Sequence, residues 1–292
     1  MGSIDAAPSR RRDLSGLLRS LLALPTIAWV LAFFAVPLGM VIVYSFATIS
    51  LVTFDISFGW TLANYRQIDD PLYLHTLVRS VLLSVSTTIG CLLLGFPLAF
   101  FISRQPPRWQ RLLLVLVIVP FWTSFIVRTY AIVNLLQDNG PLNDALNGLG
   151  ITHGSLGLLY TPRSIAIGIV YSYLPLMVLP IYVSLERIDP ALLDAAADLG
   201  ASGRRVFRRV VLPLARPGIV VGCIIVGIPA MGEYVIPEIL GGGKTLMLGN
   251  VITDQYLSVG DIPFGSAIAV VLMVVMAAVL LASRRGGALE PG

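Results

Sequence analysis

The chain has 292 residues, of which 56% are hydrophobic and only 12% are charged, and its formal net charge is +4. Because a soluble domain has about 25% charged residues, this composition excludes an ordinary soluble globular protein and indicates an all-α polytopic membrane protein. The two cysteines, Cys91 and Cys223, lie in apolar segments, which argues against a disulfide framework. The two histidines, His75 and His153, are isolated in loops, so we expect no metal site.

The chain begins with a basic tail, residues 1–20, and then becomes strongly apolar. The first apolar run is longer than the roughly 7–15-residue core of a signal peptide, so we expect it to be retained as a span. Since a bilayer core needs about 20 apolar residues as helix, the sequence predicts a membrane domain over residues 21–284, followed by a tail over 285–292. The six expected transmembrane helices are Leu21–Phe46, Thr76–Ser103, Leu112–Leu135, Ser164–Leu185, Pro217–Leu240 and Phe264–Ser283.

Arginine is distributed unequally between the two sides of these spans. One side holds Arg10, Arg11, Arg12, Arg19, Arg104, Arg108, Arg111, Arg187, Arg204, Arg205, Arg208, Arg209, Arg216, Arg284 and Arg285, and the other holds Arg66, Arg79, Arg163 and Lys244. By the positive-inside rule, the arginine-rich side is cytoplasmic. An even number of spans places both termini on that side.

The longest cytoplasmic segment, residues 186–216, carries a helix signal of its own. Asp189 is a suitable N-cap and Pro190 a suitable first helical residue, while Gly200 is a typical helix stop. We expect a second helix over Ala201–Leu212 that Pro213 and Pro217 end before the next span.

The first of these two helices is short and has two faces. Its apolar stripe consists of Leu192, Ala195, Ala196 and Leu199. Its acidic face consists of Asp194 and Asp198. Isolated helices below about 12–15 residues are marginal in water, so such a helix needs a surface to rest on. The residues alone leave two possibilities open: the helix seats in a groove of a partner protein, or it lies on the membrane with arginines against anionic lipid.

This loop resembles a motif of known transport proteins. The order Asp194-Ala195-Ala196, then Gly200, then Val210-Val211-Leu212-Pro213 after nine residues is similar to the EAA loop of ABC-importer permeases, Glu-Ala-Ala–x3–Gly–x9–Ile-x-Leu-Pro. Asp194 stands where that family has Glu, and Val210 where it has Ile. The resemblance implies a coupling helix that contacts an ATPase. The residues it assigns to this contact are Asp194, Ala195, Ala196, Leu199, Gly200 and Pro213.

The resemblance extends from about Leu21 to Arg284. Three segments look like the spermidine/putrescine permeases in particular: Pro120–Arg128, Pro229–Glu238 and Gly249–Val251. It implies the type I ABC importer transmembrane domain in the bacterial inner membrane. The implied partners are an ABC ATPase homodimer that binds ATP and Mg²⁺, a second and different permease subunit, membrane lipid, and a periplasmic or lipid-anchored substrate-binding protein. It implies no catalytic residue, no cofactor and no nucleic-acid partner for this chain.

Charged residues inside the spans mark a candidate substrate path, because buried charge in a membrane is costly and usually functional. Arg128 and Glu233 each lie about 16 residues, or about 24 Å, above the cytoplasmic end of their spans. They either pair with each other, or Glu233 receives a cationic amine. Pro229 and Pro237 predict an irregular, cavity-lining stretch around Glu233. The candidate path residues are Glu233, Glu238, Trp122, Tyr173 and Tyr234, the aromatic ones as cation–π faces.

Gly241–Thr245 looks like a phosphate-binding loop, but Glu238 occupies the position where that motif needs its first glycine. We therefore expect ATP hydrolysis in another chain. Three other functions stay open: an importer permease for an opine or amino acid, an autonomous secondary transporter, and a membrane enzyme. The EAA-like loop argues against the second, and the lack of a nucleophile–base set argues against the third.

Overall fold

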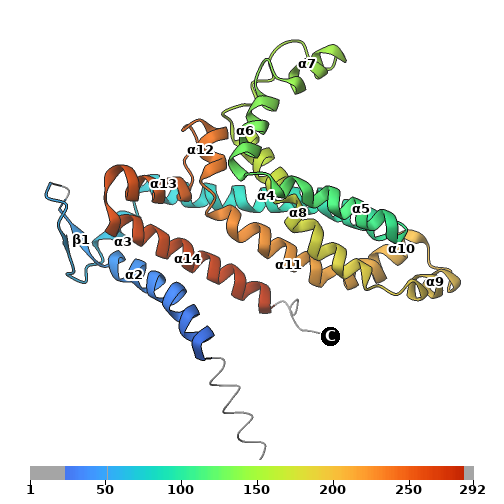
Figure 1. Cartoon of the computed structure of the whole chain (residues 1–292), viewed down its shortest axis with the longest axis horizontal. Helices are drawn as coiled ribbons and strands as arrows, with labels where there is room; N and C mark the ends of the chain where they lie inside the picture. The colour runs from blue at the N-terminus through green and yellow to red at the C-terminus, as the bar shows by residue number, and fades with distance from the viewer. Residues whose placement is uncertain (1–23, 51, 286–292) are drawn as a thin grey trace, which may run out of the picture.

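The computed structural model of the chain describes residues 24–50 and 52–285. The basic tail 1–20 and all but the first residue of the expected tail 285–292 lie outside these described residues. Figure 1 shows an elongated bundle in which long helices run side by side, with short helices and a β-ribbon at its ends. In the ribbon, the antiparallel strands β1 and β2 pair Thr48 with Ser57 and Ile49 with Ile56.

The elements follow one another in a simple order. They are η1 (Leu31–Ala35), α2 (Val36–Ser45), β1 (Thr48–Ile49), β2 (Ile56–Ser57), α3 (Ala63–Gln67), α4 (Pro71–Ser103), α5 (Pro107–Ile118), η2 (Val119–Trp122), α6 (Phe125–Leu136), α7 (Pro141–Gly148), α8 (Pro162–Glu186), α9 (Pro190–Asp198), α10 (Gly203–Val206), η3 (Phe207–Val211), α11 (Leu212–Met231), α12 (Val235–Gly241), α13 (Leu248–Asp254), η4 (Gln255–Val259) and α14 (Ile262–Arg285).

Five helices within the described residues are long and apolar enough to cross a membrane. They are Leu24–Ser45, Pro71–Ser103, Pro162–Glu186, Gly203–Met231 and Ile262–Ser283. These correspond to five of the six expected spans; four of them have ends within about five residues of the expected ones, and the fifth is displaced further towards the N-terminus. The fifth span ends at Met231 rather than Leu240, because the backbone leaves the helix at Gly232–Tyr234 before α12 begins. This break is the irregular stretch that Pro229 and Pro237 predict.

The third expected span, Leu112–Leu135, is a bent pair of helices rather than one continuous helix. Counted as one broken span, the pair Pro107–Trp122 and Phe125–Gly148 brings the spans in the described residues to the six expected. The chain bends by 96° between Pro107–Trp122 and Phe125–Gly148. Pro120 supplies no backbone N–H, and Thr123 adopts an extended conformation with ψ 151°, so the helical hydrogen bonds stop there. Neither α5 nor α6, of 12 residues each, is long enough to cross a bilayer alone.

The second cytoplasmic helix also differs from expectation. It begins at Gly203, and Pro213 and Pro217 do not end it, since helix continues to Met231. The segment before Pro213 is η3, a π-helical turn in which the Leu212 N–H donates to the Phe207 carbonyl five residues back. This wider turn lets the backbone stay helical as it approaches a residue with no N–H.

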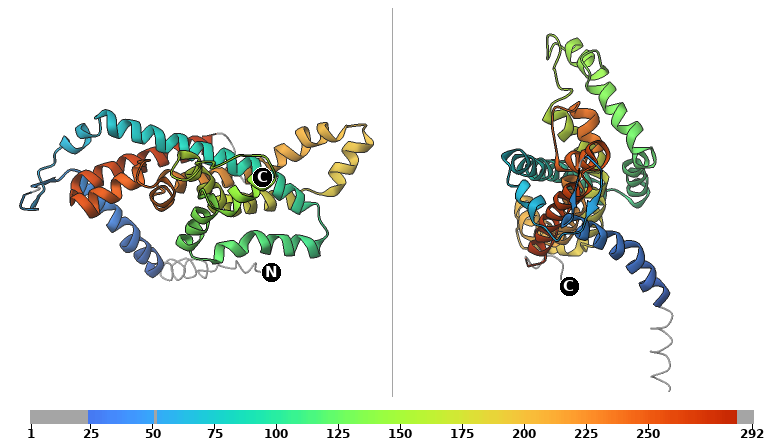
Figure 2. Two further views of the ribbon diagram at one scale, coloured as in Figure 1. Left: turned by 90° about the horizontal axis from the view of Figure 1, so that it is seen from above. Right: turned by 90° about the vertical axis from the view of Figure 1, so that its left-hand side faces the viewer.

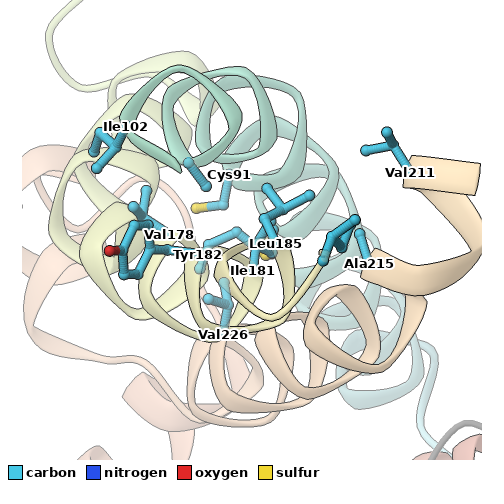
Figure 3. Packing of buried hydrophobic residues seen from close by; sticks show 12 residues of the cluster. Cys91, Ile102, Val178, Ile181, Tyr182, Leu185, Val211, Ala215 and Val226 are labelled. Carbon is cyan, nitrogen blue, oxygen red and sulfur yellow. The ribbon is translucent and has the colours of Figure 1, made fainter. Parts of the chain in front are cut away.

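The core lies where α4, α8 and α11 pack together. Its buried side chains include Cys91, Met177, Ile181 and Val226, and Figure 3 shows several members of this cluster between the three helices. Small residues allow the close approach: a Cβ added at Gly218 would overlap the Pro180 carbonyl oxygen. Such packing is the main source of helix association in lipid, where apolar surface gains little from leaving the solvent.

Candidate functional site

The predicted coupling helix, α9, projects from one end of the bundle together with α10 (Figures 1 and 2). Oδ1 of Asp189 accepts a 2.9 Å hydrogen bond from the Ala191 N–H, and Pro190 is the first helical residue, as the sequence predicts. Gly200 ends the helix in the left-handed region with φ +76°. The N–H groups of Gly200 and Ala201 donate to Ala197 and Ala196 at 2.9 and 3.1 Å, which is the Schellman pattern.

The exposure of α9 is suited to a docking element. Leu193 packs against the core cluster and Ile188 is buried, so one side of the helix is attached to the bundle. Asp194 and Ala195 are exposed, Ala196 is half-buried, and the Leu199 side chain is 88% exposed. An apolar side chain that is so exposed at the C-cap position offers a contact for another surface. Pro213, the remaining predicted coupling residue, is also exposed but lies in α11.

Glu233 lies at the break between α11 and α12 and is only 8% exposed. Its Oε2 accepts a 2.7 Å hydrogen bond from the Tyr173 hydroxyl on α8. Its Oε1 accepts hydrogen bonds of 3.1 and 3.4 Å from the N–H groups of Val235 and Ile236. Glu233 therefore caps the start of α12 and joins it to α8. This capping role was not predicted from the sequence, although Pro229 and Pro237 gave a signal for the helix break at which Glu233 lies.

Arg128 does not pair with Glu233 in this structure. Its guanidinium donates to the carbonyl oxygens of Phe121 and Thr123 at 3.4 and 3.1 Å and lies 4.9 Å from the Phe121 ring centroid. Arg128 thus holds the bend between η2 and α6, and it is 7% exposed. Together with Ser172 and Tyr173, it borders a hollow of about 330 Å³. Tyr173 therefore borders this hollow and also donates a hydrogen bond to Glu233.

The other path residues are more exposed. Asn250 on α13 donates through Nδ2 to Oε2 of Glu238 at 2.8 Å and to the Tyr234 carbonyl oxygen at 3.1 Å. Glu238 is exposed, and the Tyr234 side chain is 47% exposed. The fold therefore gathers Glu233, Glu238 and Tyr234 around the start of α12. Asn250 was not singled out as a site residue, although a polar residue between apolar neighbours was a visible signal.

Trp122 lies apart from this group. It is on η2, next to the Phe121 that stacks on Arg128, and its side chain is 83% exposed. No described contact joins it to Glu233 or Glu238 in residues 24–50 and 52–285. Its place in the path stays a prediction that depends on what covers the bend.

Comparisons with known proteins agree with one another. A family model described as "Binding-protein-dependent transport system inner membrane component" matches residues 92–286. The chain is 42% identical over 255 residues to the spermidine/putrescine transport system permease protein PotB of Salmonella typhimurium (strain SL1344), covering 87% of this chain and 88% of that protein. It is 41% identical over 255 residues to the protein of the same name from Escherichia coli (strain K12), covering 87% and 92%.

One solved structure is similar in fold over nearly the whole chain. It is a bacterial alginate ABC transporter in complex with alginate pentasaccharide-bound periplasmic protein, with a TM-score of 0.71, 17% sequence identity and 93% coverage of both chains. At this identity the likeness is one of fold.

Proposed function

The chain belongs to the family of inner-membrane components of binding-protein-dependent transport systems, and we propose that it forms part of the path for spermidine and putrescine in an ATP-driven importer. It is a multi-pass inner-membrane permease. The observation that carries the choice of substrate is the 42% identity, over 87% of this chain, to a spermidine/putrescine permease.

We propose that a partner protein hydrolyses the ATP that drives transport. In this proposal α9 seats in grooves of an ABC ATPase homodimer that binds ATP and Mg²⁺, and this chain has no catalytic role. The exposed Leu199, the firm N-cap at Asp189 and the left-handed Gly200 support this role for α9. Both termini lie on the cytoplasmic side, as the distribution of arginine favours. A second, different permease completes the path, and a binding protein delivers substrate from the opposite side.

The proposed path leads past the carboxylates at the start of α12. Glu238 is exposed and meets the substrate first. Glu233 is buried, lies closer to the end of α11, and meets the substrate after Glu238. The three donors that Glu233 accepts from are a neutral hydroxyl and two backbone N–H groups, so none of its hydrogen-bond partners among the described residues is a cation. A protonated amine supplies the missing charge. Tyr173, Tyr234 and Trp122 add aromatic faces for the same cation.

Transport then proceeds by alternating access. Closure of the ATPase dimer moves α9, and the motion passes through the continuous helix Gly203–Met231 to the α11–α12 break beside Glu233. The backbone is helical without interruption from Gly203 to Met231, next to Glu233, although Pro213, Pro217 and Pro229 within it supply no N–H. Movement at α9 therefore changes the surroundings of Glu233 and releases the amine.

Uptake by cells tests the substrate. The gene is deleted, and entry of labelled spermidine, putrescine, arginine and octopine is measured with and without the intact gene. We expect a loss confined to the two polyamines that the gene restores. A loss confined to arginine or octopine would instead make the chain a permease for amino acids or opines. Unchanged uptake of all four, in cells with no redundant system, would overturn the assigned substrate.

A further inference from the structure

Two charged side chains are buried within the part of the chain that the structure describes, and they carry opposite charges. Arg128 on α6 is 7% exposed, and Glu233 at the start of α12 is 8% exposed. Arg128 donates to carbonyl oxygens, and Glu233 accepts from a hydroxyl and two backbone N–H groups, so no described ion pair neutralises either charge. A buried charge without a counter-ion is costly in a membrane, so each of these side chains would be stabilised by an opposite charge.

Arg128 has donor capacity that the bend between η2 and α6 does not use. Its Nε is buried without a hydrogen-bond partner among the described residues, and so is the hydroxyl of Ser172 on α8. Both residues border the same hollow of about 330 Å³, together with Phe125 and Tyr173. We call this space the Arg128 hollow. Because buried polar groups are normally hydrogen-bonded, two unpaired groups that border one space indicate that an oxygen acceptor enters it.

The packing of three helices brings Glu233 close to the Arg128 hollow. Phe125 of α6, Tyr173 of α8 and Ile236 of α12 belong to or pack against one apolar cluster. Tyr173 borders the hollow, and its hydroxyl lies 2.7 Å from Oε2 of Glu233. The carboxylate is therefore one hydrogen bond away from a side chain that borders the hollow.

We propose that the Arg128 hollow is a second position for the Glu233 carboxylate, in which Arg128 replaces the amine as its counter-ion. Glu233 has the one buried carboxylate among the described residues, and water in the hollow would satisfy the hydrogen bonds but not the charge. A change of side-chain rotamer moves a glutamate carboxylate by several ångström without moving its backbone. The backbone is held here, because a Cβ added at Gly249 would lie 2.6 and 2.8 Å from the carbonyl oxygens of Gly232 and Glu233.

This exchange of counter-ions gives the amine a way to leave. In the position that the structure shows, Glu233 offers its charge to a protonated amine. In the Arg128 hollow the same charge is neutralised by Arg128, and the amine loses its partner. The role rests on the proposed passage of an amine past Glu233. Because α6 packs against α12, and α11 ends beside Glu233, movement of these helices between the two access states changes the gap between the two side chains.

The amides at the start of α12 report where the carboxylate lies. In the position shown, Oε1 of Glu233 accepts from the N–H groups of Val235 and Ile236, which lie in the first helical turn and have no acceptor within their own helix. The assembled transporter is purified through a tag on this chain, kept free of polyamine, and compared by hydrogen exchange with and without a non-hydrolysable ATP analogue. We expect these two amides to exchange about tenfold faster in one of the two nucleotide states.

Three variants separate the charge of Arg128 from its place in the bend. Arg128→Gln removes the counter-ion, so the two amides should stay protected in both nucleotide states. Arg128→Lys keeps the positive charge and should keep the difference between the states. The control Arg79→Gln removes an exposed arginine of α4 on the proposed outer side and should behave like the parent. Exchange of the α6 amides shows whether the bend stays folded in each variant.

Two results would overturn this role of Arg128. Equal exchange of the Val235 and Ile236 amides in both nucleotide states would show that the carboxylate does not leave them. A difference that persists in Arg128→Gln would show that movement of α12, rather than the counter-ion, causes it. If Arg128→Gln loosens α6, Arg128→Lys decides, since loss of the difference in that folded variant would contradict a role of the charge.

The exchange experiment contains no polyamine, so its outcome is separate from that of the uptake experiment. A difference between the nucleotide states that depends on Arg128, in a transporter that takes up no polyamine, would overturn the assigned substrate and leave the counter-ion in place. Normal polyamine uptake with equal exchange in both states would do the reverse.

Discussion

The phenolic hydroxyl of Tyr173, in the middle of α8, donates a 2.7 Å hydrogen bond to Oε2 of Glu233, at the break between α11 and α12. The other carboxylate oxygen accepts from the first N–H groups of α12. One buried side chain therefore joins three helices, and its partner Tyr173 also borders the hollow next to Arg128. This arrangement makes Glu233 a carboxylate that is held in place before any amine arrives.

Replacing Glu233 by glutamine should lower spermidine uptake by about tenfold, corresponding to about 1.4 kcal/mol of lost interaction with the amine. Glutamine keeps the size and one acceptor oxygen but removes the charge. The matched variant Tyr173→Phe removes the hydrogen bond and keeps the charge, so its uptake should fall less. Uptake is measured at equal amounts of assembled transporter. Equal losses in the two variants would reduce Glu233 to a structural cap, and unchanged uptake in Glu233→Gln would remove it from the path.

Replacing Gly200 by aspartate should detach the ATPase. A side chain at φ +76° costs about 1–2 kcal/mol, and here it also points into open space where the partner is expected. The amount of ATPase that co-purifies with the chain should fall by a factor of about 5–30. The control is Gly150→Asp, since Gly150 has φ +69° and nothing within 4 Å but follows α7, away from α9. Normal ATPase recovery with Gly200→Asp would contradict the docking role.

Much of the fold was predictable because it depends on local composition. The expected spans Thr76–Ser103 and Ser164–Leu185 match α4 and α8 closely, since twenty apolar residues in a row have few other stable arrangements in lipid. The caps of α9 were predictable for a similar reason: Asp189 and Gly200 act on backbone groups within three residues of themselves.

The 96° bend and the Tyr173–Glu233 contact were not predictable in this way. Pro97, Pro175 and Pro180 lie inside continuous helices, so Pro120 carried no local sign that its helix would turn. The Tyr173–Glu233 contact joins residues 60 positions apart and depends on how α8 packs against α11. Equal depth in the membrane suggested Arg128 as the partner of Glu233, but depth gives no information about position around the bundle.

Removing the α9 cap should loosen that helix without unfolding the bundle. Asp189→Ala loses the acceptor for the Ala191 N–H, at a cost of about 1 kcal/mol, whereas Asp189→Asn keeps an oxygen there. Hydrogen exchange of the amides in α9 should become about fivefold faster in Asp189→Ala only. Exchange in α8 and α11 should not change. Equal exchange in the two variants would mean that contacts of Leu193, rather than the cap, hold α9.

Adding one methyl group at Gly218 should destabilise the core. The new Cβ would overlap the Pro180 carbonyl oxygen and lie 2.8 Å from Cβ of Ser184, so α8 and α11 would have to separate. Overpacking of this kind costs about 1–3 kcal/mol and should lower the apparent Tm in detergent. Gly39→Ala in α2 has nothing within 4 Å and should leave the Tm unchanged or slightly raised. A normal Tm for Gly218→Ala would show that these helices can shift apart.

The central claim, that this chain carries polyamines only when an ATPase drives it, is tested most directly in proteoliposomes. The transporter is purified through a tag on this chain and reconstituted with its binding protein, with labelled spermidine on the binding-protein side and ATP on the side of α9. We predict accumulation of spermidine against its gradient that requires ATP and is lost in the Gly200→Asp variant. Accumulation of the same size without ATP, or an ATP-driven preparation that takes up no spermidine, would contradict the account.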